Sequence, residues 1–144
     1  MLDTNICIYI IKQQPPSVAR RFAQCRQGEV VISSITLAEL EYGVFKSREA
    51  TREQNRRALD ALVKMIPAIP FDNAAAKIYA AVRAAAQQRR RDALDKLIAS
   101  HAKSLSLTLV TNNLGDFRAY PGINLENWVE NSSPDNSGEA IALV

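Results

Sequence analysis

The stretch that decides the fold is the start of the chain, Met1-Leu2-Asp3-Thr4-Asn5-Ile6-Cys7-Ile8-Tyr9-Ile10-Ile11. Its opening residues are typical of a short β-strand, and the apolar run that follows is typical of a helix packed on a sheet. Asp3 lies where the two meet. A carboxylate beside buried apolar residues costs free energy unless a cation or hydrogen-bond donors compensate it. Asp3 is therefore a candidate helix cap or a candidate cation ligand, and both hold if Thr4 or Asn5 provides the cap.

Short β-like runs alternate with longer helical runs through the rest of the chain. This alternation predicts an α/β fold, with a central parallel sheet of about five strands flanked by helices in a Rossmann-like α/β/α sandwich. In such sheets, functional sites form beyond the carboxyl ends of the strands. We expect strands near residues 1–4, 29–33, 67–71, 107–111 and 123–126, and helices near residues 5–12, 17–27, 34–46, 50–64, 72–87 and 92–105.

Three further acidic residues stand in contexts similar to that of Asp3. Glu39 interrupts an apolar stretch, Asp95 precedes Lys96-Leu97-Ile98-Ala99, and Asp116 follows the strand-like run 107–111 after a short turn. Carboxylates that converge on one point raise each other's pKa values unless a divalent ion lies between them. Because hard cations prefer oxygen ligands, the simplest interpretation is a carboxylate-only site for Mg²⁺ or Mn²⁺. Its expected metal ligands and catalytic residues are Asp3, Glu39, Asp95 and Asp116.

Periodicity alone does not decide which acidic residues of two predicted helices face such a site. Glu39 and Glu41 lie on different stripes of one helix, and both stripes carry apolar residues. Asp95 competes in the same way with Asp92, which is a candidate N-cap. Asp116 lies in the good turn sequence Asn112-Asn113-Leu114-Gly115-Asp116, where an aspartate often serves only the turn.

The net charge of +3 arises from local groups of arginines. A basic surface beside an acidic pocket suits a phosphodiester substrate, whereas solvated helix faces are the alternative interpretation of each group. The triplet just before Asp95 is the group that we expect to contact substrate. The three groups are Arg20, Arg21 and Arg26, then Arg52, Arg56 and Arg57, then Arg89, Arg90 and Arg91.

Length and composition bound the class of protein. A chain of 144 residues fits one domain that buries roughly two thirds of its unfolded surface. The longest apolar run is far below the ~20 residues that span a bilayer, and no secretion signal is visible, so we expect a cytoplasmic protein without a membrane segment. Cys7 and Cys25 are too few for a disulfide framework or a zinc site. The Ser-, Asn- and Pro-rich end of the chain predicts a disordered polar tail over residues 129–144.

The single histidine and the single tryptophan are better interpreted as structural residues. His101 lies on a predicted core helix, and we expect it to pack or to make a buried hydrogen bond. One histidine also excludes an acid–base pair of the ribonuclease A type. Trp128, near the end of the fold, is expected to anchor the core rather than to stack on a base.

Five segments in this order resemble the PIN-domain family, and most closely the VapC toxins of bacterial toxin–antitoxin pairs. The resemblance covers residues 1–128. The first segment contains Asp3, the second runs from Ile32 to Gly43, and the third runs from Asp95 to Ala102. The fourth is Leu109-Val110-Thr111-Asn112-Asn113-Leu114-Gly115-Asp116-Phe117, and the fifth comprises Pro121-Gly122-Ile123 and Glu126-Asn127-Trp128.

The resemblance implies a metal-dependent endoribonuclease that cleaves structured RNA, most commonly tRNA, and that a VapB-type antitoxin holds silent. It implies a homodimer and a hetero-oligomer with the antitoxin. It selects Glu39 over Glu41 and Asp95 over Asp92 as site residues. We expect contacts with substrate from Thr4, Asn5, Thr111, Asn113 and Arg91. Where relatives usually carry a glycine-containing and largely uncharged loop, this chain has the arginine triplet.

Three alternatives remain beside this interpretation. A phosphatase of the haloacid dehalogenase type needs a second aspartate two residues after the first, where this chain has Asn5. A response-regulator receiver needs clustered acids at the first strand and a late lysine. A catalytically inactive, RNA-binding PIN protein would lack a carboxylate, and none of the four is missing. Because only Met1 and Leu2 precede Asp3, we also expect the natural chain to start further upstream.

Overall fold

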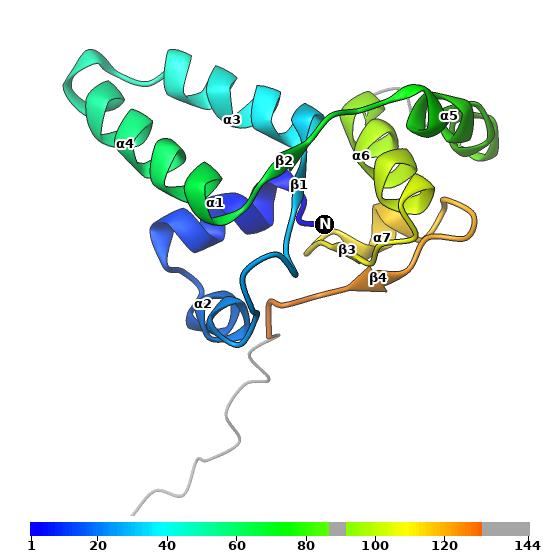
Figure 1. The fold of residues 1–144 in the computed structure, drawn as a ribbon, viewed down its shortest axis with the longest axis horizontal. Coiled ribbons are helices and arrows are strands. Elements are labelled where there is room, and N and C mark those ends of the chain that lie inside the picture. The colour runs from blue at the N-terminus through cyan, green and yellow to red at the C-terminus, as the bar shows by residue number, and fades with distance from the viewer. Residues whose placement is uncertain (87–91, 131–144) are drawn as a thin grey trace, which may run out of the picture.

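The computed structural model describes residues 1–86 and 92–130, and it contains a parallel sheet held together at Leu2 (Figure 1). Strand β1 (Ile32–Ser33) pairs in parallel with β2 (Ala68–Ile69), and β3 (Leu109–Val110) pairs in parallel with β4 (Leu125–Glu126). Leu2 forms parallel bridges to Ile32 on one side and to Val110 on the other. The order across the sheet is therefore β2, β1, the Leu2 segment, β3 and β4.

Seven helices surround this sheet in the described part of the chain. In Figure 1, α1 to α4 lie on one side of the sheet, and α5 to α7 lie on the other. The helices are α1 (Thr4–Lys12), α2 (Pro16–Ala23), α3 (Ser34–Phe45), α4 (Glu49–Met65), α5 (Asn73–Ala85), α6 (Ala93–Ser104) and α7 (Leu114–Phe117).

Two hydrophobic cores lie on opposite faces of the sheet. Leu2 and Val110 belong to the core beneath α1, α2, α3 and α4, whereas their chain neighbours Met1 and Leu109 belong to the core beneath α5, α6 and α7. Successive residues of an extended strand point to opposite faces, so this alternation divides the two cores. The predicted α/β fold, a parallel sheet with helices on both faces, is confirmed.

The elements differ from the expected ranges mainly at their ends. The segment expected as a strand over residues 1–4 is a single bridging residue, and every strand is only two residues long. The helix expected over 17–27 begins at Pro16 and ends at Ala23. Ser17 lies inside this helix, and its buried hydroxyl accepts from the Glu130 N–H at 3.2 Å. Helix α7 forms where the sequence predicted a turn, and the Asn113 side chain does not cap it.

Several expectations lie partly or wholly outside the described residues. The third basic group, Arg89, Arg90 and Arg91, lies outside the described residues. The expected tail also lies outside them, apart from Val129 and Glu130. In the described ranges, no helix is both long and apolar enough to cross a membrane. Cys7 is buried and Cys25 is half-buried, and both are free thiols.

The strand pairing generates a stability prediction. Ile32 is fully buried in the strand that joins Leu2 to β2. Replacing it with alanine leaves a cavity beneath α1 and should lower the free energy of unfolding by about 2–5 kcal/mol, measured by urea denaturation. Leu105→Ala is the control, because Leu105 is exposed, and it should cost less than about 1 kcal/mol. Equal effects of the two substitutions would contradict the assignment of Ile32 to the core.

Candidate active site at the carboxyl edge of the sheet

Asp3 leaves the central position of the sheet and caps the helix that follows it. Its backbone N–H donates to the Val110 carbonyl at 3.0 Å, and its Oδ1 atom accepts from the Ile6 N–H at 2.9 Å. The side chain that caps α1 is thus Asp3 itself, not Thr4 or Asn5. Burial raises the pKa of Asp3, and hydrogen bonds from the Thr111 side chain and the Ile6 N–H partly offset that rise. The carboxylate is therefore buried and held in a fixed position.

Helix α3 brings Glu39 to the same edge. The Thr4 hydroxyl donates to Glu39 Oε1 at 2.7 Å, across 35 residues of sequence. Ser33, the last residue of β1, starts α3 because its Oγ atom accepts from the Ile35 N–H at 3.1 Å. Glu39 is half-buried, and its negative charge contributes to the raised pKa of Asp3. The Leu2 segment and α3 therefore place Asp3 and Glu39 close enough to interact electrostatically.

Asp116 reaches this edge from the far side of the sheet. It lies in α7, which follows β3, and its Oδ2 atom accepts from the Asn113 side-chain amide at 2.6 Å. Asn113 is itself held, because its backbone N–H donates to Thr111 Oγ1 at 3.0 Å. Thr111 thereby contacts both Asn113 and Asp3. Thr4, Thr111 and Asn113 each bind a candidate carboxylate or its neighbour, whereas Asn5 is exposed on α1.

Asp95 lies where the charges of the other carboxylates meet. It is half-buried in the first turn of α6. Its pKa is raised to about 6, first by burial and then by the negative charges of Asp3, Glu39, Asp92 and Asp116. Charges that act on one another in this way lie near one another. The structure thus brings all four predicted carboxylates to one region.

These residues suit a hard divalent cation in their chemistry. All four donors are carboxylate oxygens, which Mg²⁺ and Mn²⁺ prefer, and a bound cation would relieve the repulsion that raises the pKa of Asp95. Within residues 1–86 and 92–130, no three His, Cys, Asp or Glu side chains are already gathered as a metal-binding cluster. The donor set therefore fits the cation, although the side chains do not form a preassembled cage.

Asp92 has a role that the sequence did not predict. It precedes α6, but its side chain does not cap that helix. Instead, its Oδ2 atom accepts from the Tyr120 hydroxyl at 2.6 Å, and its Oδ1 atom lies 2.9 Å from the buried Lys96 ammonium. Burial raises the pKa of Asp92, but the hydrogen bonds from Tyr120 and Lys96 outweigh it and leave the pKa lowered. The i, i+4 spacing of Asp92 and Lys96 could have predicted their ion pair, whereas no pattern in the sequence predicted the contact with Tyr120.

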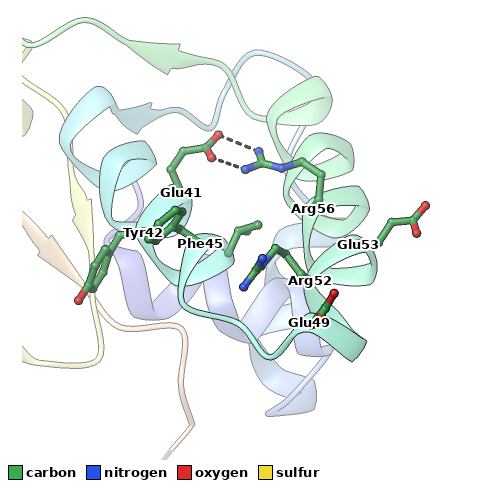
Figure 2. Close-up of a pocket in the computed structure, with 8 residues that line it drawn as sticks. Glu41, Tyr42, Phe45, Glu49, Arg52, Glu53 and Arg56 are labelled. Carbon is green, nitrogen blue, oxygen red and sulfur yellow. Dashed lines mark hydrogen bonds and ion pairs between the residues drawn. The ribbon is translucent and has the colours of Figure 1, made fainter.

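Glu41 is an exposed helix charge with a partner on α4. It forms a bidentate ion pair with Arg56 of α4, at 2.9 and 2.5 Å, that spans a groove of about 740 Å³ between α3 and α4 (Figure 2). The groove also contains Phe45, one of the most exposed large hydrophobic residues. The residues that line the groove come from α3 and α4, and none of them is one of the four candidate carboxylates.

The described arginines of the first two basic groups are largely engaged with acidic partners. Arg20 pairs with Glu130 at 3.0 Å, and Arg21 pairs with Glu126 at 2.8 Å. In the second group, Arg57 pairs with Glu53 on the same helix, in addition to the pair between Arg56 and Glu41. These contacts favour the solvated-face interpretation of both groups, and each exposed pair contributes little to stability.

His101 and Trp128 are structural, as predicted. His101 is 1% exposed, and its Nδ1 atom lies 2.8 Å from Ser33 Oγ. Trp128 is buried in the core beneath α1 and donates from its indole N–H to Glu126 Oε1 at 3.0 Å. Neither side chain is exposed to stack on a nucleic-acid base.

Comparisons with known proteins give the family. A PIN-domain family model matches residues 1–123. The tRNA(fMet)-specific endonuclease VapC of Shigella flexneri is 43% identical over 130 residues, which cover 89% of this chain and 96% of that protein. Ribonuclease VapC2 of Rickettsia felis is 40% identical over 131 residues, which cover 89% of this chain and 96% of that protein.

A solved structure resembles the whole described fold. The crystal structure of VapBC2 from Rickettsia felis bound to a DNA fragment from their promoter matches with a TM-score of 0.80 and 39% identity. The match covers 90% of this chain and 98% of the other. These findings remove the phosphatase and receiver alternatives, because neither belongs to this family. The chain belongs to the PIN-domain family, and the curated relatives described above are named as VapC nucleases.

Proposed function

We propose that this protein is the toxin of a type II toxin–antitoxin pair and a Mg²⁺- or Mn²⁺-dependent endoribonuclease that cleaves structured RNA, most specifically tRNA. The observation that carries the proposal is the gathering of Asp3, Glu39, Asp95 and Asp116 at one edge of the sheet, where burial and the neighbouring negative charges raise the pKa of Asp95 to about 6. Four carboxylates close together repel one another and would also repel the negative phosphates of RNA. A bound cation would neutralise this charge and allow a phosphate to bind.

Asp3, Glu39, Asp95 and Asp116 are the residues that would hold the cation. When bound, it would neutralise charge on the scissile phosphate and make hydroxide available from water near neutral pH. The chain itself supplies orientation. The Ile6 N–H and the Thr111 side chain fix Asp3, and the Thr4 hydroxyl fixes one oxygen of Glu39. Donors of this kind hold ligating carboxylates in place and strengthen binding of the ion.

Support for an RNA substrate comes from the relatives. The protein from Shigella flexneri is named as a tRNA(fMet)-specific endonuclease, and the one from Rickettsia felis is named as a ribonuclease. Both align with about nine tenths of this chain. A tRNA substrate would place the protein in the cytoplasm. Arg91, outside the described residues, precedes Asp95 closely enough in sequence to contact the phosphates of such a substrate.

Support for an antitoxin comes from the solved relative, which is a complex of VapB and VapC on promoter DNA. We propose that this chain likewise forms a homodimer and assembles with a VapB-type antitoxin that silences it. The exposed Tyr42 and Phe45 on α3 provide apolar surface for contacts with another chain.

Cleavage of tRNA is the direct test of the proposed activity. Purified, antitoxin-free protein incubated with total tRNA and Mg²⁺ or Mn²⁺ should give discrete fragments on a denaturing gel, and EDTA should abolish them because the carboxylates cannot act without the cation. Binding of tRNA without cleavage in either metal would support the inactive, RNA-binding alternative instead.

Two glutamates on one helix provide a matched pair for the same assay. Glu39→Gln should lower the cleavage rate at least ~100-fold, because it removes a charge at the site. Glu41→Gln should change it less than about twofold, because Glu41 pairs with Arg56 away from the site. Both variants lose one negative charge from α3, so the comparison controls for net charge. Similar losses in the two variants would argue against Glu39 as a site residue.

The raised pKa of Asp95 predicts a pH-dependent cost in folding. A carboxyl whose pKa is higher in the folded state destabilises that state when it is ionised, so the cost is present above pH 6 and disappears as the pH falls through 6 towards 3.8. In EDTA at pH 7.5, Asp95→Asn should therefore raise the free energy of unfolding by about 1 kcal/mol, a value discounted because the group is half-exposed. Near pH 4 the gain should vanish. Thermal denaturation at both pH values measures it, and a destabilised variant at pH 7.5 would contradict the electrostatic picture.

Assembly with the antitoxin is tested by co-expression. The chain and its cognate VapB-type antitoxin should elute together in size-exclusion chromatography with a mass above that of either protein, and the complex should not cleave tRNA. Added after purification, the antitoxin should suppress cleavage in proportion to its concentration until the toxin is saturated. Separate elution of the two proteins at micromolar concentration would contradict the proposed partnership.

A further inference from the structure

We propose that His101 is a positioning residue, which acts through Ser33 to set the separation of the two helices that carry Glu39 and Asp95. The inference rests on the proposed function, because it assigns a purpose to those two carboxylates. His101 itself touches neither carboxylate nor substrate. It lies at the junction between α6, which carries Asp95, and the start of α3, which carries Glu39.

The contact at this junction is buried and specific. His101 Nδ1 lies 2.8 Å from Ser33 Oγ, and both residues are at most 1% exposed. Ser33 Oγ already accepts from the Ile35 N–H, so its hydroxyl hydrogen is available for donation to the imidazole. This arrangement calls for a neutral imidazole with its proton on Nε2. Burial lowers the pKa of His101, although the nearby charge of Asp72 acts in the opposite direction. The lowered pKa favours the neutral ring.

The two carboxylates lie at equal distances along their helices from the contact between Ser33 and His101. Glu39 lies six residues after Ser33, and Asp95 lies six residues before His101. At 1.5 Å per residue, each carboxylate lies about 9 Å along its helix from the junction. Helix α3 runs forward from this junction to Glu39, and α6 runs back from it to Asp95. The negative charge of Glu39 contributes to the raised pKa of Asp95, so the two carboxylates lie near each other. The hydrogen bond between Ser33 and His101 therefore joins the helix that carries Glu39 to the helix that carries Asp95.

An aromatic ring also packs against the imidazole. The ring of Phe71 meets it edge-on, with centroids 5.5 Å apart and planes at 76°. Phe71 is held in turn, because its backbone N–H donates to Ser34 Oγ at 3.0 Å. The junction thus joins β1, α3, α6 and the segment before α5. Phe71 provides a control, since it packs on the same ring without taking part in the hydrogen bond to Ser33.

The experiment measures Mn²⁺ binding directly, from the electron paramagnetic resonance signal of free Mn²⁺, in wild type and three variants. His101→Leu removes the acceptor, and His101→Asn retains an acceptor oxygen near the position of Nδ1. We expect His101→Leu to weaken Mn²⁺ binding about 10-fold, as for loss of an outer contact to a metal site. His101→Asn should recover binding to within about threefold of wild type. Phe71→Leu, which disturbs packing at the same ring, should bind within about twofold of wild type.

The outcomes separate this inference from the proposed function. If wild type binds Mn²⁺, Glu39→Gln does not, and His101→Leu binds as tightly as wild type, the positioning role is wrong and the metal site stands. If wild type binds no Mn²⁺ at millimolar concentration, the proposed function fails and the positioning role fails with it. Equal weakening in His101→Leu, His101→Asn and Phe71→Leu would show a packing effect and overturn the role of the hydrogen bond.

A second measurement does not depend on how the variants fold. Nitrogen NMR of the wild-type His101 ring should show an unprotonated Nδ1 and a protonated Nε2 at neutral pH. Addition of Mg²⁺ should shift the Nδ1 resonance, because cation binding draws the two helices together at the site edge and changes the bond to Ser33. A proton on Nδ1, or a resonance indifferent to Mg²⁺, would overturn the proposal.

Discussion

The parallel bridges that Leu2 makes on both sides are the contacts on which the rest of this structure depends. Leu2 joins the strand pair β1–β2 to the pair β3–β4, although it is the only residue of its segment paired on both sides. Because chain direction is shared across the sheet, the bridges place the carboxyl ends of three segments at one edge. Asp3, Ser33 and Thr111 are the residues that leave the sheet there. The candidate site is thus a direct consequence of sheet topology.

The site concentrates an electrostatic cost at this edge. The four carboxylates come from α3, α6, α7 and the segment before α1. Burial, followed by the negative charges of Asp3, Glu39, Asp92 and Asp116, raises the pKa of Asp95 to about 6. The two hydrophobic cores on either side of the sheet offset such a cost, since each buries large aliphatic side chains completely. A fold stabilised mainly by apolar packing is able to keep repelling charges together, and binding of a cation would turn that repulsion into attraction.

Sequence reasoning predicted the parts of the fold that depend on local pattern. The alternation of apolar runs was enough to predict the parallel sheet and six helices. Helix α5 starts near its expected position because the Asp72 carboxylate caps it, accepting from the Ala75 N–H at 2.9 Å. The choice of Glu39 over Glu41 came from family resemblance, because both stripes of α3 carry apolar residues. Tertiary contacts decide which partner each glutamate has: Glu39 accepts from the Thr4 hydroxyl, and Glu41 pairs with Arg56. The role of Asp92 required the position of Tyr120, 28 residues away, which no periodicity encodes.

The hydrogen bonds at Asp3 and Glu39 explain how the candidate ligands are both held and available. A carboxylate has two oxygens and about four acceptor positions, so one or two donors leave capacity for a cation. At Asp3 the cap to Ile6 occupies Oδ1, and at Glu39 the Thr4 hydroxyl occupies Oε1. The donors that fix these two side chains are neutral, so they orient the carboxylates without cancelling their charge. An arginine or lysine in their place would orient them equally well, but it would remove the negative potential that draws in a divalent ion.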